Sequence, residues 1–441
     1  MDHSVRERGL VDSSPPSQAS ISRDETIESG EKTITDFNSD ALSFDRGLQA
    51  WLQVFASWLL FFNTWGIVTA FGVFQTYYEQ EILSHRSPSA ISWIGSTQSF
   101  LLLFIGAVTG PLFDAGYSRQ LLFAGMFLVP FGLMMTSISQ KFWHILLAQG
   151  FCVGIGCGCL FMPCLAIIPQ YFKQKRAFAS GAAATGSGVG GVLYPIIFRQ
   201  LQLRIGFAWA ARVLGFVSFG MILVSFAILQ IRFQPTEKRS LIQLSAFKDP
   251  VYSLFCVSQF VGIAGLYNVM VYVQSYAIKN HIMSDNLAFY LLALLNTASA
   301  CGRVLPNYFV DYVGPLNIIF PMALVSSLLA FSWIAIYSSA GIIALVVLYG
   351  FFTGGYVSIA PVVIMTITPD LRDYGTRLGM SFIFVATGAL IGTPIGGAIV
   401  SFMHGDYLGV KIFAGVCLFS SGVLMAATRF TKTGPRLFAK A

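Results

Sequence analysis

Long apolar runs constrain this chain more than any other feature, because they follow one another along nearly its whole length. Each is about 20 residues long or longer, which is what a helix needs to cross the hydrocarbon core of a membrane. We predict twelve spans, six in each half: 50–75, 89–113, 119–138, 143–169, 177–198, 207–230, 251–277, 287–310, 316–337, 341–367, 378–402 and 407–428. Only 11% of the residues are charged, whereas a soluble domain has about 25%. The chain is therefore predicted to be an all-α membrane protein.

The second half of the sequence repeats short patterns of the first half at nearly the same offset. An aspartate followed within a few residues by glycine ends an apolar run at Asp114 and again at Asp311. The other repeated residues are Gln75-Thr76-Tyr77 and Gln274-Ser275-Tyr276, Arg176 and Arg377, and Ser180 and Ser381. Two parallel repeats of about six helices are the build of a large class of secondary transporters. We therefore divide the chain into a tail (1–44), a six-helix half (45–230), a linker (231–250), a second six-helix half (251–430) and a C-terminal tail (431–441).

The distribution of lysine and arginine predicts how the chain is oriented. Short cytoplasmic loops are enriched in both residues. The loops on the side of the N-terminus hold more of them than the opposite loops, which carry His85, His144, His281 and His404. We therefore predict a multi-pass protein of the cell membrane with both termini in the cytoplasm; a vacuolar or other internal membrane is the alternative. Residues 1–44 are rich in Ser, Asp, Glu and Thr, do not resemble a secretory signal, and are predicted to be disordered.

Several patterns that suggest other chemistry have simpler explanations. The formal net charge of +7 would suit nucleic acid, but the basic residues flank apolar runs, as membrane orientation requires. Cys157 and Cys159 lie in a span without the histidine or carboxylate that would complete a metal site. Gly154, Gly156 and Gly158 lie inside a span and follow no strand, as a dinucleotide-binding loop would. We expect no metal, no cofactor, no nucleic-acid partner and no enzymatic activity.

Four stretches of the sequence resemble one transporter family. The first, Gly110-Pro111-Leu112-Phe113-Asp114-Ala115-Gly116-Tyr117-Ser118-Arg119, is similar to the loop signature of the major facilitator superfamily, found between its second and third helices. Residues 171–181 resemble the fifth-helix signature of monocarboxylate porters, residues 45–51 resemble that family's entry to the first helix, and residues 375–397 resemble its fungal members. The resemblance covers residues 45–400 and implies the major facilitator fold, with two six-helix pseudo-repeats.

The resemblance also implies a set of residues that control changes of conformation. In the superfamily the loop signature and its copy form a cytoplasmic latch, in which the aspartate accepts from helix N-termini and pairs with a basic residue. On this chain the set is Gly110, Asp114, Gly116, Arg119, Asp311, Gly314, Arg176 and Arg377. Ala115 and Asn307 depart from the pattern, because a basic residue and a glycine are frequent there. The alternative is a charged turn that only keeps the loop in water.

Arg303 is the candidate binding residue that the sequence singles out most sharply. It lies well inside the eighth predicted span, where a charge is costly unless it faces a cavity or a partner. Its guanidinium would bind an anion through a planar fork of hydrogen-bond donors. The alternative is that Arg303 extends toward the cytoplasmic surface or pairs there with Asp311.

Neighbouring polar residues complete the predicted binding site. Animal monocarboxylate porters usually have an aspartate four residues before this arginine and a lysine in the first helix, where this chain has Ser299 and Thr69. Asn63, Asn268 and Asn296 lie on the helices that line the central pathway in the superfamily, although buried amides also join helices structurally. No Asp, Glu or His lies in the central part of a span, so the usual proton carrier is missing.

These observations predict a secondary transporter that works by alternating access. We expect a monomer in a lipid bilayer that moves a small organic anion or a secondary metabolite, anionic or aromatic, with export favoured. Import of a carboxylate or a vitamin is one alternative. A nutrient sensor that keeps the transporter fold without moving a solute is the alternative from another class, and measurable solute flux would exclude it.

Overall fold

The structure is a computed structural model that describes residues 47–172, 175–232, 242–369 and 373–434. The predicted tail 1–44 and most of the predicted C-terminal tail lie outside the described residues. The described residues form helices, turns and loops without a strand. This agrees with the predicted all-α class.

The first half of the chain consists of α2 (Leu48–Thr69), α3 (Phe71–Tyr77), α4 (Pro88–Leu112), α5 (Ser118–Ile138), α6 (Phe142–Ile145), α7 (Gly154–Ala166), α8 (Ile168–Tyr171) and α9 (Arg176–Ile228). The second half consists of α10 (Pro250–Lys279), α11 (Asp285–Val313), α12 (Pro315–Ser332), α13 (Ser339–Ile367), α14 (Tyr374–Phe402) and α15 (Leu408–Thr433). Short π-helical segments, 78–82 and 146–153, extend α3 and join α6 to α7.

Local chemistry explains where several helices begin. The side chains of Ser87, Asp249, Ser284 and Ser338 each accept a hydrogen bond from the backbone of the first helical turn that follows them. Such caps satisfy amide groups that the helix itself leaves unpaired. Proline occupies the first position of α4, α10 and α12, where its missing N–H costs nothing. These helix starts therefore follow from the sequence.

Eleven helices among the described residues are long and apolar enough to cross a membrane, where the sequence predicts twelve spans. The difference lies in α9, which is 53 residues long, about twice the length of its neighbours. Gly206 interrupts α9 with φ 80° and ψ 168°, a conformation that glycine adopts easily. The two predicted spans 177–198 and 207–230 lie on either side of this glycine. Split there, α9 provides the fifth and sixth spans.

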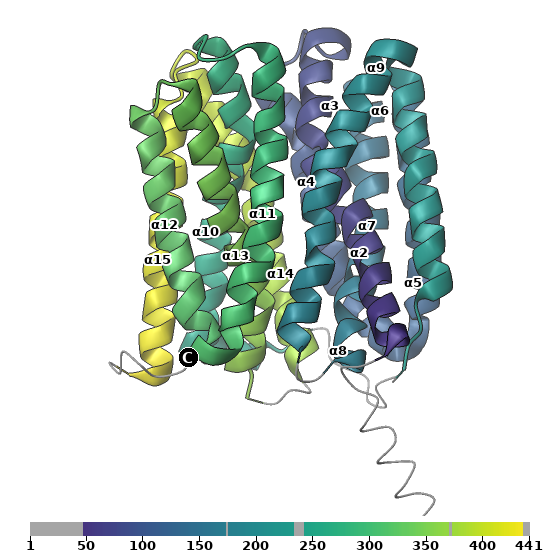
Figure 1. The fold of residues 1–441 in the computed structure, drawn as a ribbon, viewed down its shortest axis with the longest axis vertical. Helices are drawn as coiled ribbons and strands as arrows, with labels where there is room; N and C mark the ends of the chain where they lie inside the picture. The colour runs from purple at the N-terminus through teal and green to yellow at the C-terminus, as the bar shows by residue number, and fades with distance from the viewer. Residues whose placement is uncertain (1–46, 173–174, 233–241, 370–372, 435–441) are drawn as a thin grey trace, which may run out of the picture.

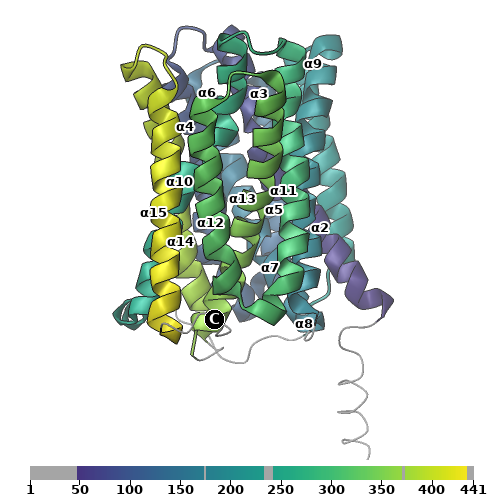
Figure 2. The ribbon, with the colours of Figure 1, turned by 60° about the vertical axis from the view of Figure 1, so that its left-hand side comes forward.

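The helices form two bundles that lie side by side (Figure 1). Helices α2 to α9 make up one bundle, and α10 to α15 make up the other. Between the bundles, α4 packs against α14 and α9 packs against α11. The start of α2 and the end of α15 lie at the same end of the molecule (Figures 1 and 2), which we call the tail side.

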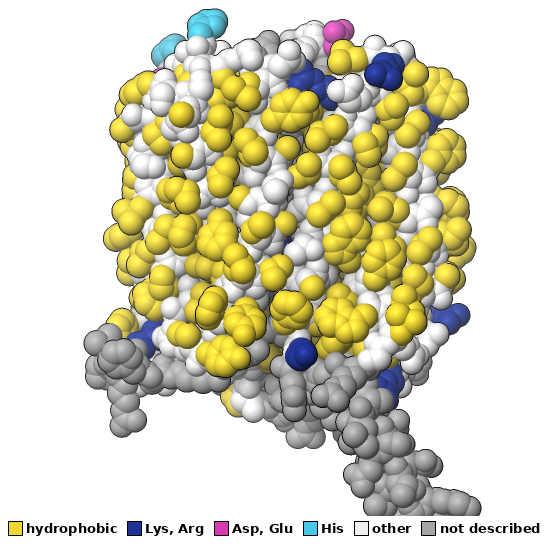
Figure 3. Space-filling view, in the orientation of Figure 1, with side chains coloured by type: hydrophobic (Ala, Val, Ile, Leu, Met, Phe, Trp, Pro, Cys, Tyr) yellow, Lys and Arg dark blue, Asp and Glu magenta, His cyan; other side chains and the backbone are white. Residues whose placement is uncertain are grey.

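The outer surface matches a protein that is surrounded by lipid. Apolar side chains cover the face between the two ends, while histidines lie at the end opposite the tail side (Figure 3), which we call the histidine side. Large exposed apolar residues include Phe123, Phe127, Phe216, Leu328 and Phe419. In water such a surface would be very unfavourable. The chain is therefore a multi-pass membrane protein.

Glycines allow the helices of each bundle to approach closely. A Cβ added at Gly66 of α2 would lie 2.8 Å from the Cα of Gly190 in α9. A Cβ added at Gly302 of α11 would overlap the carbonyl oxygen of Phe351 in α13. Small residues of this kind let membrane helices pack backbone against backbone.

Replacing Gly302 with alanine should therefore destabilise the protein. The Phe351 oxygen belongs to a helix backbone and cannot move aside as a side chain could, and overpacking of this kind costs about 1–3 kcal/mol. Gly220 is the matched control, because a Cβ there meets no atom within 4 Å. We expect a lower melting temperature in detergent for Gly302→Ala than for Gly220→Ala. Equal melting temperatures would contradict the close contact between α11 and α13, because they would show that a methyl group fits between Gly302 and Phe351.

Candidate functional site

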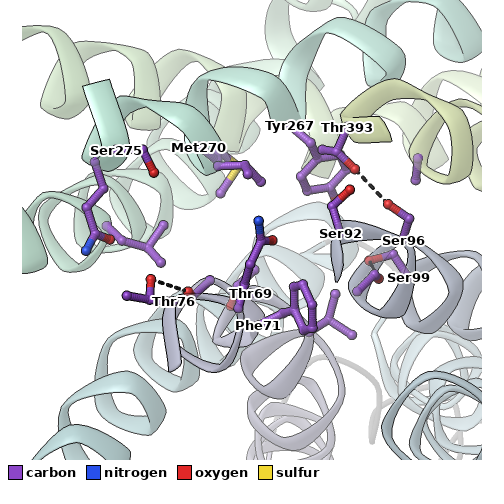
Figure 4. A pocket seen from close by; sticks show the side chains of 18 of the residues that line it. Thr69, Phe71, Thr76, Ser92, Ser96, Ser99, Tyr267, Met270, Ser275 and Thr393 are labelled. Atoms are coloured by element: carbon purple, nitrogen blue, oxygen red, sulfur yellow. Dashed lines mark hydrogen bonds between the residues drawn. The ribbon is translucent and has the colours of Figure 1, made fainter. Parts of the chain in front are cut away.

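A cavity lies between the two bundles on the histidine side. The first half contributes residues of α2, α3 and α4, and the second half contributes residues of α10, one residue of α11 and two of α14. Figure 4 shows Thr69, Phe71, Thr76, Ser92, Ser96 and Ser99 from the first half, facing Tyr267, Met270, Ser275 and Thr393 from the second. Both repeats therefore build this site.

A break in the first span places polar groups at the cavity. The hydroxyl of Thr69 donates to the carbonyl oxygens of Trp65 (2.9 Å) and Gly66 (3.1 Å). Hydroxyls that bond back to their own helix in this way often bend it, and α2 ends at Thr69 before α3 starts at Phe71. The side chain of Thr69 lies on the cavity wall at this break.

The polar repeat found in the sequence lies on both walls of the cavity. Gln75 and Thr76 line it from α3, and Gln274 and Ser275 line it from α10. In the sequence these pairs mark the duplication of the two halves, and Gln274 is also one of the deep polar residues expected at a cavity. Related halves of a transporter meet around a central site, so a polar pattern shared by both halves is a signal that could have located it.

Glu79 is the only Asp, Glu, Lys, Arg or His among the described residues that line the cavity. It lies in the π-helical segment that follows α3, and its carboxylate accepts a hydrogen bond of 2.8 Å from the amide of Gln75. Burial raises the pKa of the Tyr407 hydroxyl, and the negative charge of Glu79 raises it further. Glu79 therefore faces the second half from the first, at the histidine-side end of the cavity.

Several hydroxyls on the cavity wall donate to their own helices. Thr76 donates to the carbonyl of Gly72 (3.1 Å), and Ser99 to that of Gly95 (2.9 Å). Ser92 donates to the carbonyl of Ser89 at 2.8 Å. These hydroxyls present mainly their oxygen lone pairs to a ligand.

One hydrogen bond crosses between the halves at the cavity. The hydroxyls of Ser96 in α4 and Thr393 in α14 lie 2.7 Å apart (Figure 4). The hydroxyl of Tyr272 donates to the carbonyl of Thr393 at 2.9 Å within the second half. These bonds fix the position of the α14 backbone beside the cavity.

Arg303 lies outside the cavity lining, toward the tail side. It is close enough to Tyr267, which does line the cavity, for the two side chains to interact electrostatically. Its Nε atom is buried without a hydrogen-bond partner among the described residues. Its carbonyl oxygen accepts from the amide of Asn307. Arg303 is thus a partly buried charge that interacts with Tyr267 of the cavity wall, and its contact with a substrate stays a prediction.

The predicted amides Asn63 and Asn268 lie against neighbouring helices and do not line this cavity. Asn63 donates to the carbonyl of Leu59 (2.7 Å), and its Oδ1 accepts from the hydroxyl of Tyr194 (2.6 Å). Asn268 donates to the carbonyl of Ala264 at 2.7 Å and packs against Gly396 of α14. Asn63 therefore joins α2 to α9 by a hydrogen bond, whereas the hydrogen bonds of Asn268 stay within α10 and its Oδ1 has no partner among the described residues.

Asn296 and Ser299 also lie outside the cavity lining. Asn296 of α11 donates to the carbonyl of Gly191 in α9 at 3.1 Å, which links the two halves. Ser299 packs against Gly354 of α13. Of the positions that the monocarboxylate porters suggested, only Thr69, where their lysine would fall, lies on the cavity wall.

The predicted latch residues cluster at the tail side. Gly116 (φ 93°) and Gly314 (φ 96°) both have the left-handed backbone that favours glycine. This explains why a glycine recurs in both copies. The side chains of Asp114 and Asp311 lie outside the described residues, so their contacts stay predictions. Arg119 is exposed, and Gly110 packs against Met162 of α7.

The two predicted arginines lie at the starts of equivalent helices. Arg377 of α14 lies 3.6 Å from the carboxylate of Asp249, the cap of α10. Burial lowers the pKa of the Arg176 guanidinium in α9, and Tyr374 at the start of α14 acts in the opposite direction. Arg176 therefore interacts across the halves, whereas Arg377 interacts within the second half.

The halves also meet on the tail side of the cavity. The rings of Phe161 in α7 and Phe382 in α14 lie 5.3 Å apart. A Cβ added at Gly181 in α9 would lie 2.9 Å from the carbonyl oxygen of Arg303, and one added at Gly379 in α14 would lie 3.4 Å from the carbonyl oxygen of Ala107 in α4. The cavity therefore lies on the histidine side of a layer where the two halves are in contact.

The cysteines form neither a framework of disulfides nor a metal centre in the part of the chain that the structure describes. All seven are free thiols, with Cys157 and Cys164 buried in α7 among packing residues. No group of three His, Cys, Asp or Glu side chains among the described residues could hold a metal ion.

Two helical bundles with a cavity between them are the architecture of many secondary transporters, and comparison with known proteins gives the family of the chain. A sequence profile described as Major Facilitator Superfamily matches residues 51–346. The chain belongs to the Major Facilitator Superfamily.

The chain is similar to fungal transporters over nearly its full length. It is 43% identical to the MFS-type transporter dbaD of Emericella nidulans, over 96% of this chain and 95% of that protein. It is 39% identical to the aspyridones efflux protein apdF of Emericella nidulans, over 86% of this chain and 77% of that protein. The MFS transporter asaE of Aspergillus flavus is 37% identical, with 90% of each chain covered.

A solved structure supports the fold independently. A crystal structure of FucP, a Major Facilitator Superfamily transporter in the outward conformation, covers 85% of this chain and 98% of its own, with a TM-score of 0.60. The identity is 16%, so this likeness concerns the fold alone.

Proposed function

We propose that the chain exports a small organic metabolite by alternating access, and that the cavity between α3, α4, α10 and α14 is its binding site. One observation carries the proposal: both repeats line the cavity, and they meet in a closed layer on its tail side. Rocking of the two halves would close the histidine side and open the tail side, which is how such folds expose one site to each side in turn.

Export is favoured by the relatives. The name of the 39% identical protein states efflux, and that of the 43% identical protein states a transporter of the same superfamily. We extend this to the chain as a secondary metabolite exporter. The import of a carboxylate or a vitamin and a sensor without flux are outcomes that the experiment below separates.

The finer features of the proposal follow from the sequence. The tail side faces the cytoplasm, because it holds most of the lysines and arginines of the loops. The membrane is the cell membrane, and the protein works as a monomer. Its place within the superfamily is near the monocarboxylate porters, on the motifs at residues 45–51 and 171–181.

Arg303 takes part in binding when the site opens to the tail side. It interacts electrostatically with Tyr267 of the cavity wall, and its Nε lacks a partner among the described residues. A small rotation of the second half would expose its donors to a ligand that arrives from the cytoplasm. The same layer contains the carbonyl contact of Gly181 with α11, which has to separate in this step.

Replacing Arg303 with alanine should lower export at least about tenfold, since hydrogen bonds to a charged group contribute about 1.5–3 kcal/mol each. The measurement compares metabolites inside and outside host cells that carry the intact gene, no gene, or Arg303→Ala. We expect one compound to accumulate inside both altered strains and to fall outside them. Arg303→Lys tests whether the planar fork matters beyond its charge, and should restore export only partly.

Other outcomes decide between the alternatives. An external carboxylate left unconsumed by both altered strains would identify an importer. Metabolite levels that stay the same in all strains, together with a changed response to nutrients, would identify a sensor. If Arg303→Ala behaves as the intact gene while the deletion does not, Arg303 is not part of the site.

A further inference from the structure

We propose that the cavity selects an uncharged ligand that carries hydroxyl groups, and that it rejects ionised carboxylates. The inference rests on the proposed function, because it concerns the substrate class of the same cavity. It narrows the range of substrates predicted from the sequence, which included organic anions. Three properties of the cavity wall support it: its charge, the direction of its hydrogen bonds and its apolar surface.

The charge of the wall is negative. Among the described lining residues Glu79 is the single charged side chain, and no lysine, arginine or histidine accompanies it. Arg303 interacts with Tyr267 and lies outside the lining. An ionised carboxylate in this space would lose water and meet a like charge without a facing cation, which is unfavourable in a partly dehydrated cavity.

Four hydroxyls of the wall are available to a ligand as acceptors, whereas the amides of Gln75 and Gln274 and the hydroxyl of Tyr267 can also donate. Four wall residues donate their hydroxyl protons to carbonyl oxygens of their own helices: Thr69, Thr76, Ser92 and Ser99. Their oxygens, with the carboxylate of Glu79, remain as acceptors. A ligand that donates hydrogen bonds, such as a phenol or an alcohol, satisfies them, whereas a ligand with acceptors only leaves them unpaired.

The remaining wall is apolar and suits a ring. Val68 and Phe71 lie on one side of the cavity, and Met270, Val271 and Leu292 lie on the other. A flat apolar body with hydroxyls at its edge would contact these side chains and reach the polar residues beyond them. Ligand sites generally combine an apolar wall with a few placed polar groups in this manner.

The role of Arg303 is compatible with an uncharged ligand. A guanidinium also donates hydrogen bonds to a neutral carbonyl oxygen. In the proposed cycle, a ligand reaches Arg303 only after the site opens to the tail side. A hydroxylated ligand that also carries a carbonyl would therefore find donors on the tail side and acceptors on the histidine side.

The test measures binding of three matched probes to the full-length purified protein in detergent at pH 7. They are 2,7-dihydroxynaphthalene, 2,7-dimethoxynaphthalene and naphthalene-2,7-dicarboxylate, which share one ring system and differ in donors and charge. Gly72→Leu gives the background, because position 72 lines the cavity and has only Leu292 Cδ2, at 3.7 Å, near an added Cβ. Binding that survives in Gly72→Leu is partition into the micelle and is subtracted.

We expect the diol to bind at least about tenfold more tightly than the dimethyl ether, which has lost two donors, and the dicarboxylate to bind weakest. Glu79→Gln, which keeps the size of the side chain and removes its charge, should improve binding of the dicarboxylate while the ether stays weak. The inference is overturned if the dicarboxylate binds as tightly as the diol, if the ether equals the diol, or if none of the three binds above background.

This result is separate from that of the export experiment. A protein that binds the diol selectively but moves no metabolite would refute the proposed function and leave the inference standing. A protein that exports a carboxylate through the cavity and binds the dicarboxylate most tightly would refute the inference and leave the proposed function standing.

Discussion

Replacing Gly72 with leucine is expected to lower export to about a tenth of the wild-type rate or less, because steric exclusion is a strong means of rejecting a ligand. Gly72 lies in α3 on the cavity wall, and the nearest atom to an added Cβ is Leu292 Cδ2 at 3.7 Å. The side chain therefore has room to extend into the cavity without displacing a helix. Leucine also forms helix more readily than glycine, so the fold should be kept.

The control for this variant is Gly220→Leu. Gly220 lies on the exposed face of α9, where an added Cβ meets nothing within 4 Å. We expect Gly220→Leu to export as the intact protein does, and both variants to reach the membrane in equal amounts, measured by immunoblotting. Normal export by Gly72→Leu at equal abundance would mean that the substrate takes another path.

A covalent link between the halves at the cavity is expected to stop transport reversibly. The hydroxyls of Ser96 and Thr393 lie 2.7 Å apart, on α4 and α14. Cysteines at both positions would lie within reach of a disulfide. Because alternating access requires the two halves to rock against each other, a bond between α4 and α14 would hold them in one arrangement.

The sequence predicts the fold well because the fold depends on signals that are local. Apolar runs set the spans, and cap residues such as Ser87 and Asp249 set helix starts. The break at Gly206 also follows from the sequence, because it lies between the predicted spans 177–198 and 207–230, although α9 extends across it from Arg176 to Ile228. The recurrence of glycine at Gly116 and Gly314 has a local cause as well, since both positions have positive φ.

The binding site is less predictable, because the face that a helix turns to the cavity is set by its neighbours. Asn63 and Asn268 are polar and deep, as a ligand-binding residue would be, but each faces another helix, where Tyr194 and Gly396 pack against them. Polarity and depth alone cannot distinguish a residue that binds a ligand from one that packs against another helix. Glu79 is hard to predict for another reason: it lies beyond the predicted end of the first span at residue 75, and the π-helical continuation to Ile82 brings it to the cavity.

A better signal was present in the repeat. Gln75 and Thr76 correspond to Gln274 and Ser275, and all four side chains line the cavity. Polar residues that recur at equivalent places in both halves, outside the tail-side loops, point to the interface where the halves meet. Binding by Arg303 remains a separate prediction. A charged side chain within the membrane is unfavourable in free energy unless it has a partner, and the described residues supply none at its Nε.

The most direct test of the account is the rate of metabolite efflux from cells that carry Ser96→Cys together with Thr393→Cys, measured after oxidation and again after reduction. The single variants serve as controls for the seven native cysteines. The account predicts that efflux in the oxidised double variant falls to background, that the reductant restores it, and that the single variants respond to neither treatment. Efflux at the intact rate from protein shown to be fully cross-linked would contradict transport by rocking of the two halves around this cavity.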